Sequence, residues 1–172
     1  MQRSFSPRFR LLPFLLLGFP LFLVFAVAAD SGPACPHCGM EKAKFGHSWM
    51  EITYDDGTKN GFCSLHCAAI DMALHTDKVP LTVTVGDYDT QEQIDAETAF
   101  WVMGGDKMGV MTTRAKWAFR TQAAADAFIA EHGGALATYG QSVQAAFEDM
   151  YKDIRMIQEK RRRTRLRKSR EE

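Results

Sequence analysis

The four cysteines of this chain form two close pairs, and each pair encloses a histidine. Cys35 and Cys38 are separated by two residues, and Cys63 and Cys67 by three. Thiolate and imidazole groups favour Cu(I), Zn(II) or an iron–sulfur cluster over Mg²⁺ and Ca²⁺. The pairs therefore indicate a soft-metal site, a disulfide framework or a redox dithiol.

The spacing of the pairs is close to that of four-cysteine zinc sites, because 24 residues separate Cys38 from Cys63. Disulfides stay open as an alternative, since an apolar leader predicts export to a compartment where they persist. A thiol oxidoreductase fits less well. Gly39 follows the first pair directly and no strand precedes that pair, whereas a thioredoxin-like motif opens a long helix after a strand.

Two methionines indicate which soft metal the site would bind. Met40 lies two residues after Cys38, and Met108 lies in the glycine-rich loop 103–111. A thioether is a poor zinc ligand and a good Cu(I) ligand, so these residues favour copper. His66, inside the second pair, is a further candidate ligand.

Short strands and helices are expected to position these residues. Alternating residues predict a strand over 46–54, and Asp55-Asp56-Gly57 predicts a hairpin turn into a second strand over 59–63. Ser64 is expected to cap a helix that ends near His75. A third strand is predicted over 80–86.

The same order of elements recurs later in the chain. The predicted elements are strands over 99–103 and 116–119, a helix over 122–132 capped by Thr121 and ended by Gly133-Gly134, and a strand over 136–139. An amphipathic helix then begins at Gln141. The sequence thus predicts an α+β fold of two small ββαβ units followed by a C-terminal helix.

The net charge of zero hides three unlike regions. Residues 1–29 carry three basic residues and no acid; residues 30–154 carry nine Lys/Arg and eighteen Asp/Glu; residues 155–172 carry nine Lys/Arg and three Asp/Glu. The first region has an apolar run, Leu11–Ala29, and small residues before Asp30, as in an export signal. We expect a cleaved signal peptide, with an uncleaved membrane anchor as the alternative.

The expected domains are a signal peptide (1–29), a first ββαβ unit with the cysteine pairs (30–88), a second with the Met/Gly loop (89–140), and a C-terminal helix with a basic tail (141–172). The tail is interpreted as a solvated helix end, with contact to a membrane surface or an acidic partner as alternatives. Export argues against nucleic acid. No phosphate loop, Gly-x-Ser-x-Gly or His-Glu-x-x-His motif indicates an enzyme.

A run of short motifs resembles the NosL family of exported copper-binding accessory proteins of nitrous oxide reductase. The motifs are, in order, Cys35-x-x-Cys38-Gly39-Met40, Asp56-Gly57, Phe62-Cys63, Lys107-Met108-Gly109, Ala118-Phe119, an alanine-rich helix and Gly133-Gly134. The resemblance covers roughly residues 35–140. It implies two ββαβ units of the type also seen in the alkylmercury lyase MerB, and no catalysis.

By position, Cys38 and Met40 match the family's Cys-x-Met copper motif, and Met108 matches its downstream methionine. The resemblance implies one Cu(I) passed to a client enzyme such as nitrous oxide reductase, or to its maturation transporter. Cys35, Cys63, Cys67 and His66 are auxiliary candidates: a wider metal site or a disulfide stays open for the cysteines. The chain lacks the lipidation cysteine of many family members, and its basic tail lies outside the resemblance.

We therefore expect a periplasmic Cu(I) metallochaperone. The alternative is an interaction domain stabilised by zinc or by disulfides, and a periplasmic thiol oxidoreductase is less favoured.

Overall fold

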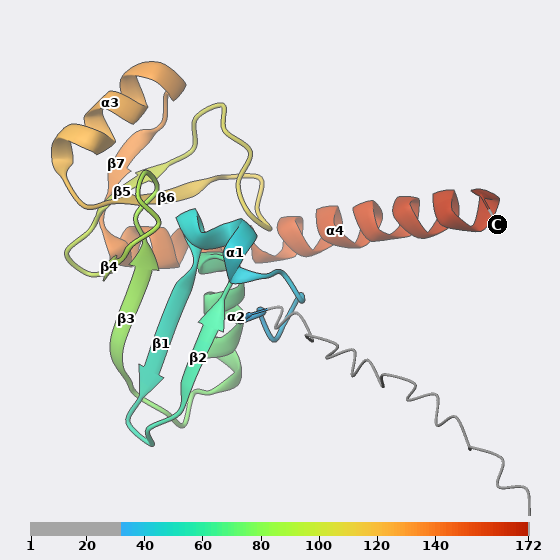
Figure 1. Cartoon of the computed structure of the whole chain (residues 1–172), viewed down its shortest axis with the longest axis horizontal. Helices are drawn as coiled ribbons and strands as arrows, with labels where there is room; N and C mark the ends of the chain where they lie inside the picture. Colours follow the sequence, from blue (N-terminus) through green and yellow to red (C-terminus); the bar gives the residue numbers. More distant parts are fainter. Residues whose placement is uncertain (1–31, 172) are drawn as a thin grey trace, which may run out of the picture. The chain divides into compact units, whose positions relative to one another are not determined.

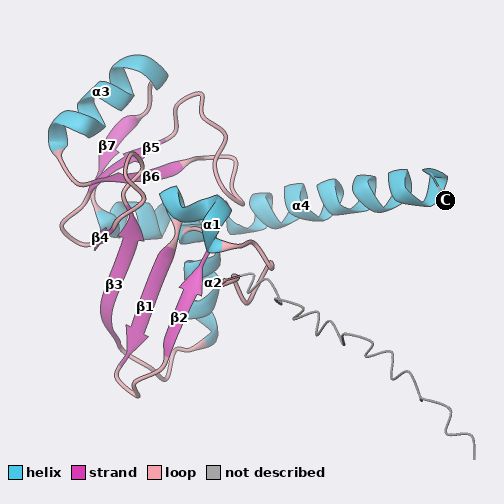
Figure 2. Ribbon diagram, viewed as in Figure 1, coloured by secondary structure: helices cyan, strands magenta, loops and turns pink. Residues whose placement is uncertain are grey.

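Two antiparallel β-sheets and a long C-terminal helix make up the α+β fold (Figures 1 and 2). The computed structural model describes residues 32–171, so the expected signal peptide lies outside the described residues. No helix within 32–171 combines the length and the hydropathy that crossing a membrane requires.

The first sheet has four strands in the order β2-β1-β3-β4. They are β1 (Met50–Tyr54), β2 (Lys59–Phe62), β3 (Pro80–Gly86) and β4 (Gln93–Asp95). The turn between β1 and β2 is the expected hairpin, with Gly57 in a left-handed conformation at φ 83°. The helix α2 (Leu65–Leu74) packs against β1 and β2. The short edge strand β4 was not predicted.

The start of the first predicted strand is wrong. A short helix α1 (Lys42–Phe45) and a 3₁₀ turn η1 (Gly46–Ser48) come before β1. The chain crosses the end of β3 here, and a Cβ atom on Gly86 would fall on the carbonyl oxygen of Gly46. The backbone N–H of Gly86 instead donates to the carbonyl of Trp49 at 2.7 Å. This close crossing prevents residues 46–48 from extending the strand.

The helix α2 begins where the sequence predicts, but Ser64 does not cap it with its side chain. The hydroxyl of Ser64 lies 3.8 Å from the sulfur of Cys63, and the Ser64 carbonyl accepts the N–H of Ala68 at 3.1 Å. The first turn of α2 is thus held by its backbone and by the packing of its buried residues.

The second sheet has the order β6-β5-β7. Its strands are β5 (Phe100–Met103), β6 (Lys116–Phe119) and β7 (Ala135–Ala137), and the helix α3 (Gln122–His132) lies between β6 and β7 in the sequence. As predicted, the Thr121 hydroxyl caps α3 by accepting the N–H of Ala124 at 3.2 Å, and Gly133 follows the helix with φ 72°. The strand β7 lies one to two residues earlier than predicted, because the next helix starts at Tyr139.

The helix α4 (Tyr139–Glu171) packs its first half against α2 and β5. Its buried residues are Ser142, Ala145, Ala146 and Asp153. From Lys160 to Glu171 every residue is exposed, and Figure 1 shows this end of α4 running beyond the two sheets.

Buried side chains form two clusters. The larger one lies around the first sheet and α2, and it contains Trp49, Met50, Phe62 and three of the four cysteines. The smaller one lies around the second sheet and α3, with Trp117, Phe119 and Phe128. The cysteines therefore belong to the main hydrophobic core.

Candidate metal centre

All four cysteine sulfur atoms meet at one place. They lie within 4.8 Å of one another, with Cys38 Sγ 3.4 Å from Cys63 Sγ and Cys63 Sγ 3.6 Å from Cys67 Sγ. Four thiolates around one tetrahedral ion at about 2.3 Å would stand about 3.8 Å apart. Small shifts of these side chains would therefore complete a four-thiolate site.

The cysteines are free thiols in this structure, so none of the disulfide pairings considered from the sequence is formed. The shortest sulfur–sulfur distance, 3.4 Å, is far longer than the bond of about 2.05 Å in a disulfide. Cys35, Cys63 and Cys67 are buried, whereas Cys38 is half-buried. Of the four sulfur ligands, Cys38 is thus the one nearest to solvent.

Two different kinds of backbone supply the sulfur atoms. Cys63 follows β2 and Cys67 lies in the first turn of α2, so the hairpin and the helix fix both. Cys35 and Cys38 lie on a loop that closes on itself: the N–H of Cys35 donates to the carbonyl of Met40 at 2.9 Å, and the N–H of Gly39 to the carbonyl of Cys35 at 2.8 Å. Gly39 has φ 77°, a conformation that favours glycine and explains its place after Cys38.

The thiols share protons through hydrogen bonds. Bonds from Cys38, Cys63 and Cys67 lower the pKa of Cys35 well below its usual range. The pKa of Cys38 is lowered to about 7: its bond with Cys35 acts to raise it, but those with Cys63 and Cys67 outweigh that effect. Hydrogen bonding with Cys35 raises the pKa of Cys63 and of Cys67. A metal ion bound by all four must therefore displace protons.

The remaining predicted ligands occupy different surroundings. Met40 is half-buried and packs against the core that holds the cysteines. Met108 is 83% exposed on the loop between β5 and β6. His66 is buried, but it lies outside the group of sulfur ligands, and its Nδ1 faces Asp153 instead. The structure thus brings the four predicted cysteine ligands together at one point.

A buried carboxyl group supports the histidine of the first cysteine pair. The Nε2 atom of His37 lies 3.4 Å from Asp71 Oδ1, and its ring stacks on Phe62 with the centroids 5.7 Å apart. The Tyr54 hydroxyl donates to Asp71 Oδ2 at 2.6 Å, and His75 Nδ1 lies 2.9 Å from the carbonyl oxygen of Asp71. Asp71 thereby connects the loop of Cys35 and Cys38 to α2.

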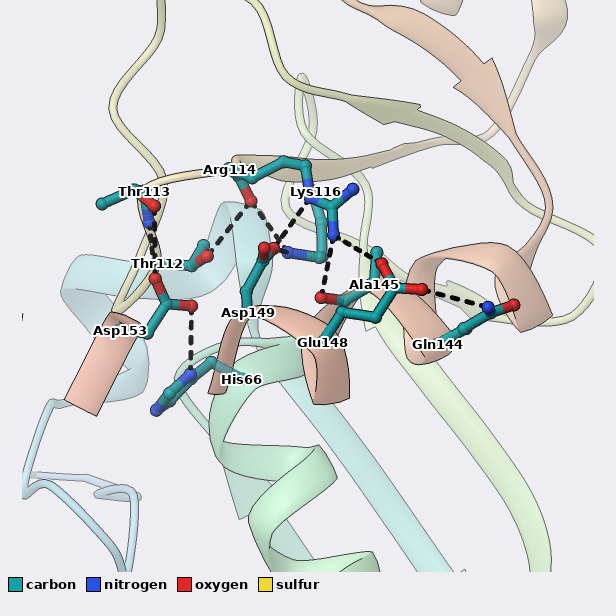
Figure 3. Close-up of polar contacts among 10 residues, drawn as sticks. All are labelled: His66, Thr112, Thr113, Arg114, Lys116, Gln144, Ala145, Glu148, Asp149 and Asp153. Carbon is teal, nitrogen blue, oxygen red and sulfur yellow. Dashed lines mark hydrogen bonds and ion pairs between the residues drawn. The ribbon is translucent and has the colours of Figure 1, made fainter. Parts of the chain in front are cut away.

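A second buried carboxyl group supports the histidine of the second pair (Figure 3). Asp153 Oδ2 lies 3.5 Å from His66 Nδ1, and Asp153 Oδ1 accepts the backbone N–H of Thr113 at 2.9 Å. Burial lowers the pKa of His66, although Asp153 opposes that shift. One residue of α4 thus contacts both α2 and the loop that leads into β6.

Charged groups next to Asp153 also bind the loop before β6 to α4. Lys116, which is buried, donates to Asp149 Oδ2 at 2.9 Å and to the carbonyl of Arg114 at 2.9 Å. Arg114 also donates to Asp149 at 2.8 Å and to Glu148 at 3.1 Å (Figure 3). Lys116 and His66 border a cavity of about 10 Å³, which is about the space of one water molecule.

Reasoning from the sequence missed both supporting carboxyl groups. Each left a weak signal. Asp71 lies four residues after Cys67, hence on the same face of α2. Asp153 interrupts the apolar face of α4 between Met150 and Ile157. An acid in such a position indicates a buried polar contact, but the sequence does not show its partner.

Comparison with known proteins relates the chain to one family and to a solved structure. The family model NosL matches residues 26–147. The crystal structure of the copper chaperone NosL from Shewanella denitrificans is similar with a TM-score of 0.53 and 26% sequence identity, over 67% of this chain and 92% of that chain. A comparison with curated proteins finds no match.

Proposed function

The chain belongs to the NosL family, and on that premise we propose that it is a metallochaperone that carries Cu(I) in the four-cysteine cluster. The family is non-enzymatic, and a solved relative is a copper chaperone. The single observation that carries the proposal is the meeting of four thiols within 4.8 Å. Thiolates bind Cu(I) strongly, which suits a protein that holds copper as cargo.

The burial of the ligands suggests a direction for copper transfer. Cys63 and Cys67 are fixed by the core, whereas Cys38 is half-buried beside Met40. An incoming ligand of an acceptor would therefore meet Cys38 first and displace the buried thiolates afterwards. Met40 is a neutral ligand on the same loop and needs no deprotonation.

We propose that Met108 binds copper at the protein surface. Its exposure keeps the thioether available to copper or to an acceptor, and the family motif is the reason to assign it.

The strand orders support a fold of two units. The orders β2-β1-β3 and β6-β5-β7 repeat one arrangement of two hairpin strands, a helix and a third strand. We propose that these are two ββαβ units of the NosL and MerB type.

We infer the client from the family and the compartment from the leader. We propose a periplasmic protein that delivers copper to nitrous oxide reductase or to its maturation transporter. The family membership supports this context, and the composition of residues 1–29 supports export.

One observation favours a second candidate function. Four cysteines that close around a point are typical of structural zinc sites, which contribute directly to folding. In that case the protein would be an interaction domain stabilised by zinc, and the methionines would not affect metal affinity.

Competition for Cu(I) under reducing, oxygen-free conditions tests the proposal. With bathocuproine disulfonate as competitor, we expect one Cu(I) per chain, and at least about a tenfold loss of affinity in Cys38→Ser. Met108→Leu should weaken binding more than Met156→Leu, a matched control on α4. Unchanged Cu(I) affinity in Cys38→Ser would refute the proposal. Weak copper binding together with unfolding on zinc removal would favour the second candidate.

A further inference from the structure

The end of α4 has no packing role in the described structure. Asp153 is the last buried residue of the helix, and residues 160–171 are all exposed. At 1.5 Å per residue this segment is about 18 Å long. The NosL family match ends at residue 147, so the metal-carrier role does not account for it.

This segment is strongly basic. Residues 158–171, here called the basic end, hold eight Lys/Arg and two Asp/Glu. The two acids make ion pairs within the helix, Glu159 with Arg163 at 2.8 Å and Glu171 with Arg167 at 3.9 Å. Because successive helical residues are 100° apart, the basic side chains project on all sides.

The helix also exposes apolar residues just before the basic end. Phe147, Tyr151 and Ile154 are 44%, 77% and 38% exposed. Their spacing of four and three residues places them on one side of α4, and Arg161 and Arg165 continue that side. These five residues are called the docking face.

We propose that the docking face and the basic end attach the protein to a membrane surface rich in anionic phospholipid. The arginines would bind lipid phosphates, and the apolar residues would enter the boundary between headgroups and acyl chains. Residues 32–146 hold fourteen Asp/Glu and eight Lys/Arg, so the same surface would repel them. The metal centre would then be held away from the lipid.

A lipid surface fits these observations better than a protein or a nucleic acid. A specific protein interface needs apolar anchors among its charges, and Leu166 is the only large apolar residue in the basic end. A nucleic acid would use the charges but not the exposed Phe147 and Tyr151. A bilayer surface offers an anionic layer beside an apolar one, which matches the basic end beside the exposed apolar residues of the docking face.

Vesicle co-sedimentation tests the proposal with residues 31–172, the compact unit that contains both hydrophobic clusters. We expect binding to vesicles with about one-third phosphatidylglycerol, little binding to pure phosphatidylcholine, and release as salt rises to about 0.5 M. Replacing Arg161, Arg162, Arg163 and Arg165 together by glutamine should weaken binding by about 100-fold or more, from about fivefold per charge before screening.

Matched variants separate charge from other causes. The same four arginines changed to lysine should keep binding within about threefold, because a diffuse anionic surface needs charge alone. Tyr151→Ser should weaken binding severalfold at every salt concentration. Cu(I) stoichiometry and the urea midpoint should be unchanged in all of them, so that a failure of metal binding is distinguished from a failure of docking.

Three results would overturn the proposal. The first is equal binding to neutral and anionic vesicles. The second is full binding by the glutamine variant. The third is tighter binding to duplex DNA than to anionic vesicles at the same salt concentration, which would assign the basic end to nucleic acid.

Discussion

Replacing Asp153 by alanine is expected to destabilise the protein by about 1.5–3 kcal/mol. Asp153 is fully buried, and it is a point where α4, α2 and the loop before β6 meet. Its Oδ1 accepts the backbone N–H of Thr113 at 2.9 Å and lies 3.4 Å from the Thr113 hydroxyl, and its Oδ2 lies 3.5 Å from His66.

The magnitude follows from the hydrogen bond that is lost. A hydrogen bond to a carboxylate contributes about 1.5–3 kcal/mol, and Thr113 is exposed, so water can take up its N–H once the carboxylate is gone. The contact with His66 adds less, because 3.5 Å is long for a hydrogen bond. In Asp153→Asn the side-chain oxygen can still accept the Thr113 N–H, so we expect about half the loss of stability that Asp153→Ala causes.

Urea unfolding followed by fluorescence measures the difference as a shift in midpoint at constant slope. The control is Asp126→Ala, an exposed acid on α3, which should change stability by less than about 0.5 kcal/mol. If Asp153→Ala loses no more than this control, the carboxyl group does not hold the three elements together.

Two further predictions concern pH and packing. Burial lowers the pKa of His47, so the unfolded chain takes up a proton below about pH 6.5 that the folded protein resists, and stability is present above that pH and falls below it. His47→Phe should flatten this fall, measured by urea unfolding at pH 7.5 and 5.5, and an unchanged slope would contradict the reasoning. Gly86→Ala should cost about 3 kcal/mol or more because its Cβ would strike the Gly46 carbonyl, whereas a Cβ on Gly140 in α4 would meet only the Thr138 hydroxyl at 4.0 Å and should cost nothing. Equal melting temperatures for the two alanine variants would contradict this.

Local signals were sufficient for several elements. The turn glycine Gly57, the strand over 80–86 and the helix over 122–132 with its Thr121 cap match the structure, because each depends on residues close in sequence. The wrong predictions concern residues whose conformation depends on contacts with segments distant in the sequence. Residues 46–48 turn because Gly86 approaches them, and the sequence alone does not show that contact.

In the candidate site, too, the sequence indicated local features but not the contacts between distant segments. The cysteine pairs were predicted as candidate metal ligands, with disulfides as an alternative, but their meeting depends on the β1–β2 hairpin, which returns Cys63 to the first loop. Sequence reasoning grouped Cys38 with methionines and left the other cysteines open. Met108 as a ligand stays a prediction. Asp71 and Asp153 were missed because the burial of an acid depends on partners from other elements.

The closed loop of Cys35 and Cys38 also bears on how fast the site can exchange its contents. Two of the four sulfur atoms belong to a backbone ring of six residues, whereas the other two are built into a hairpin and a helix. The part of the ring that carries the half-buried Cys38 can move outward while the sheet and α2 stay intact, whereas Cys35 is held in the core. We therefore expect opening on the time scale of loop motion, nanoseconds to microseconds, and not on that of unfolding. The folded protein would then be kinetically labile at one side of its metal centre and inert at the other.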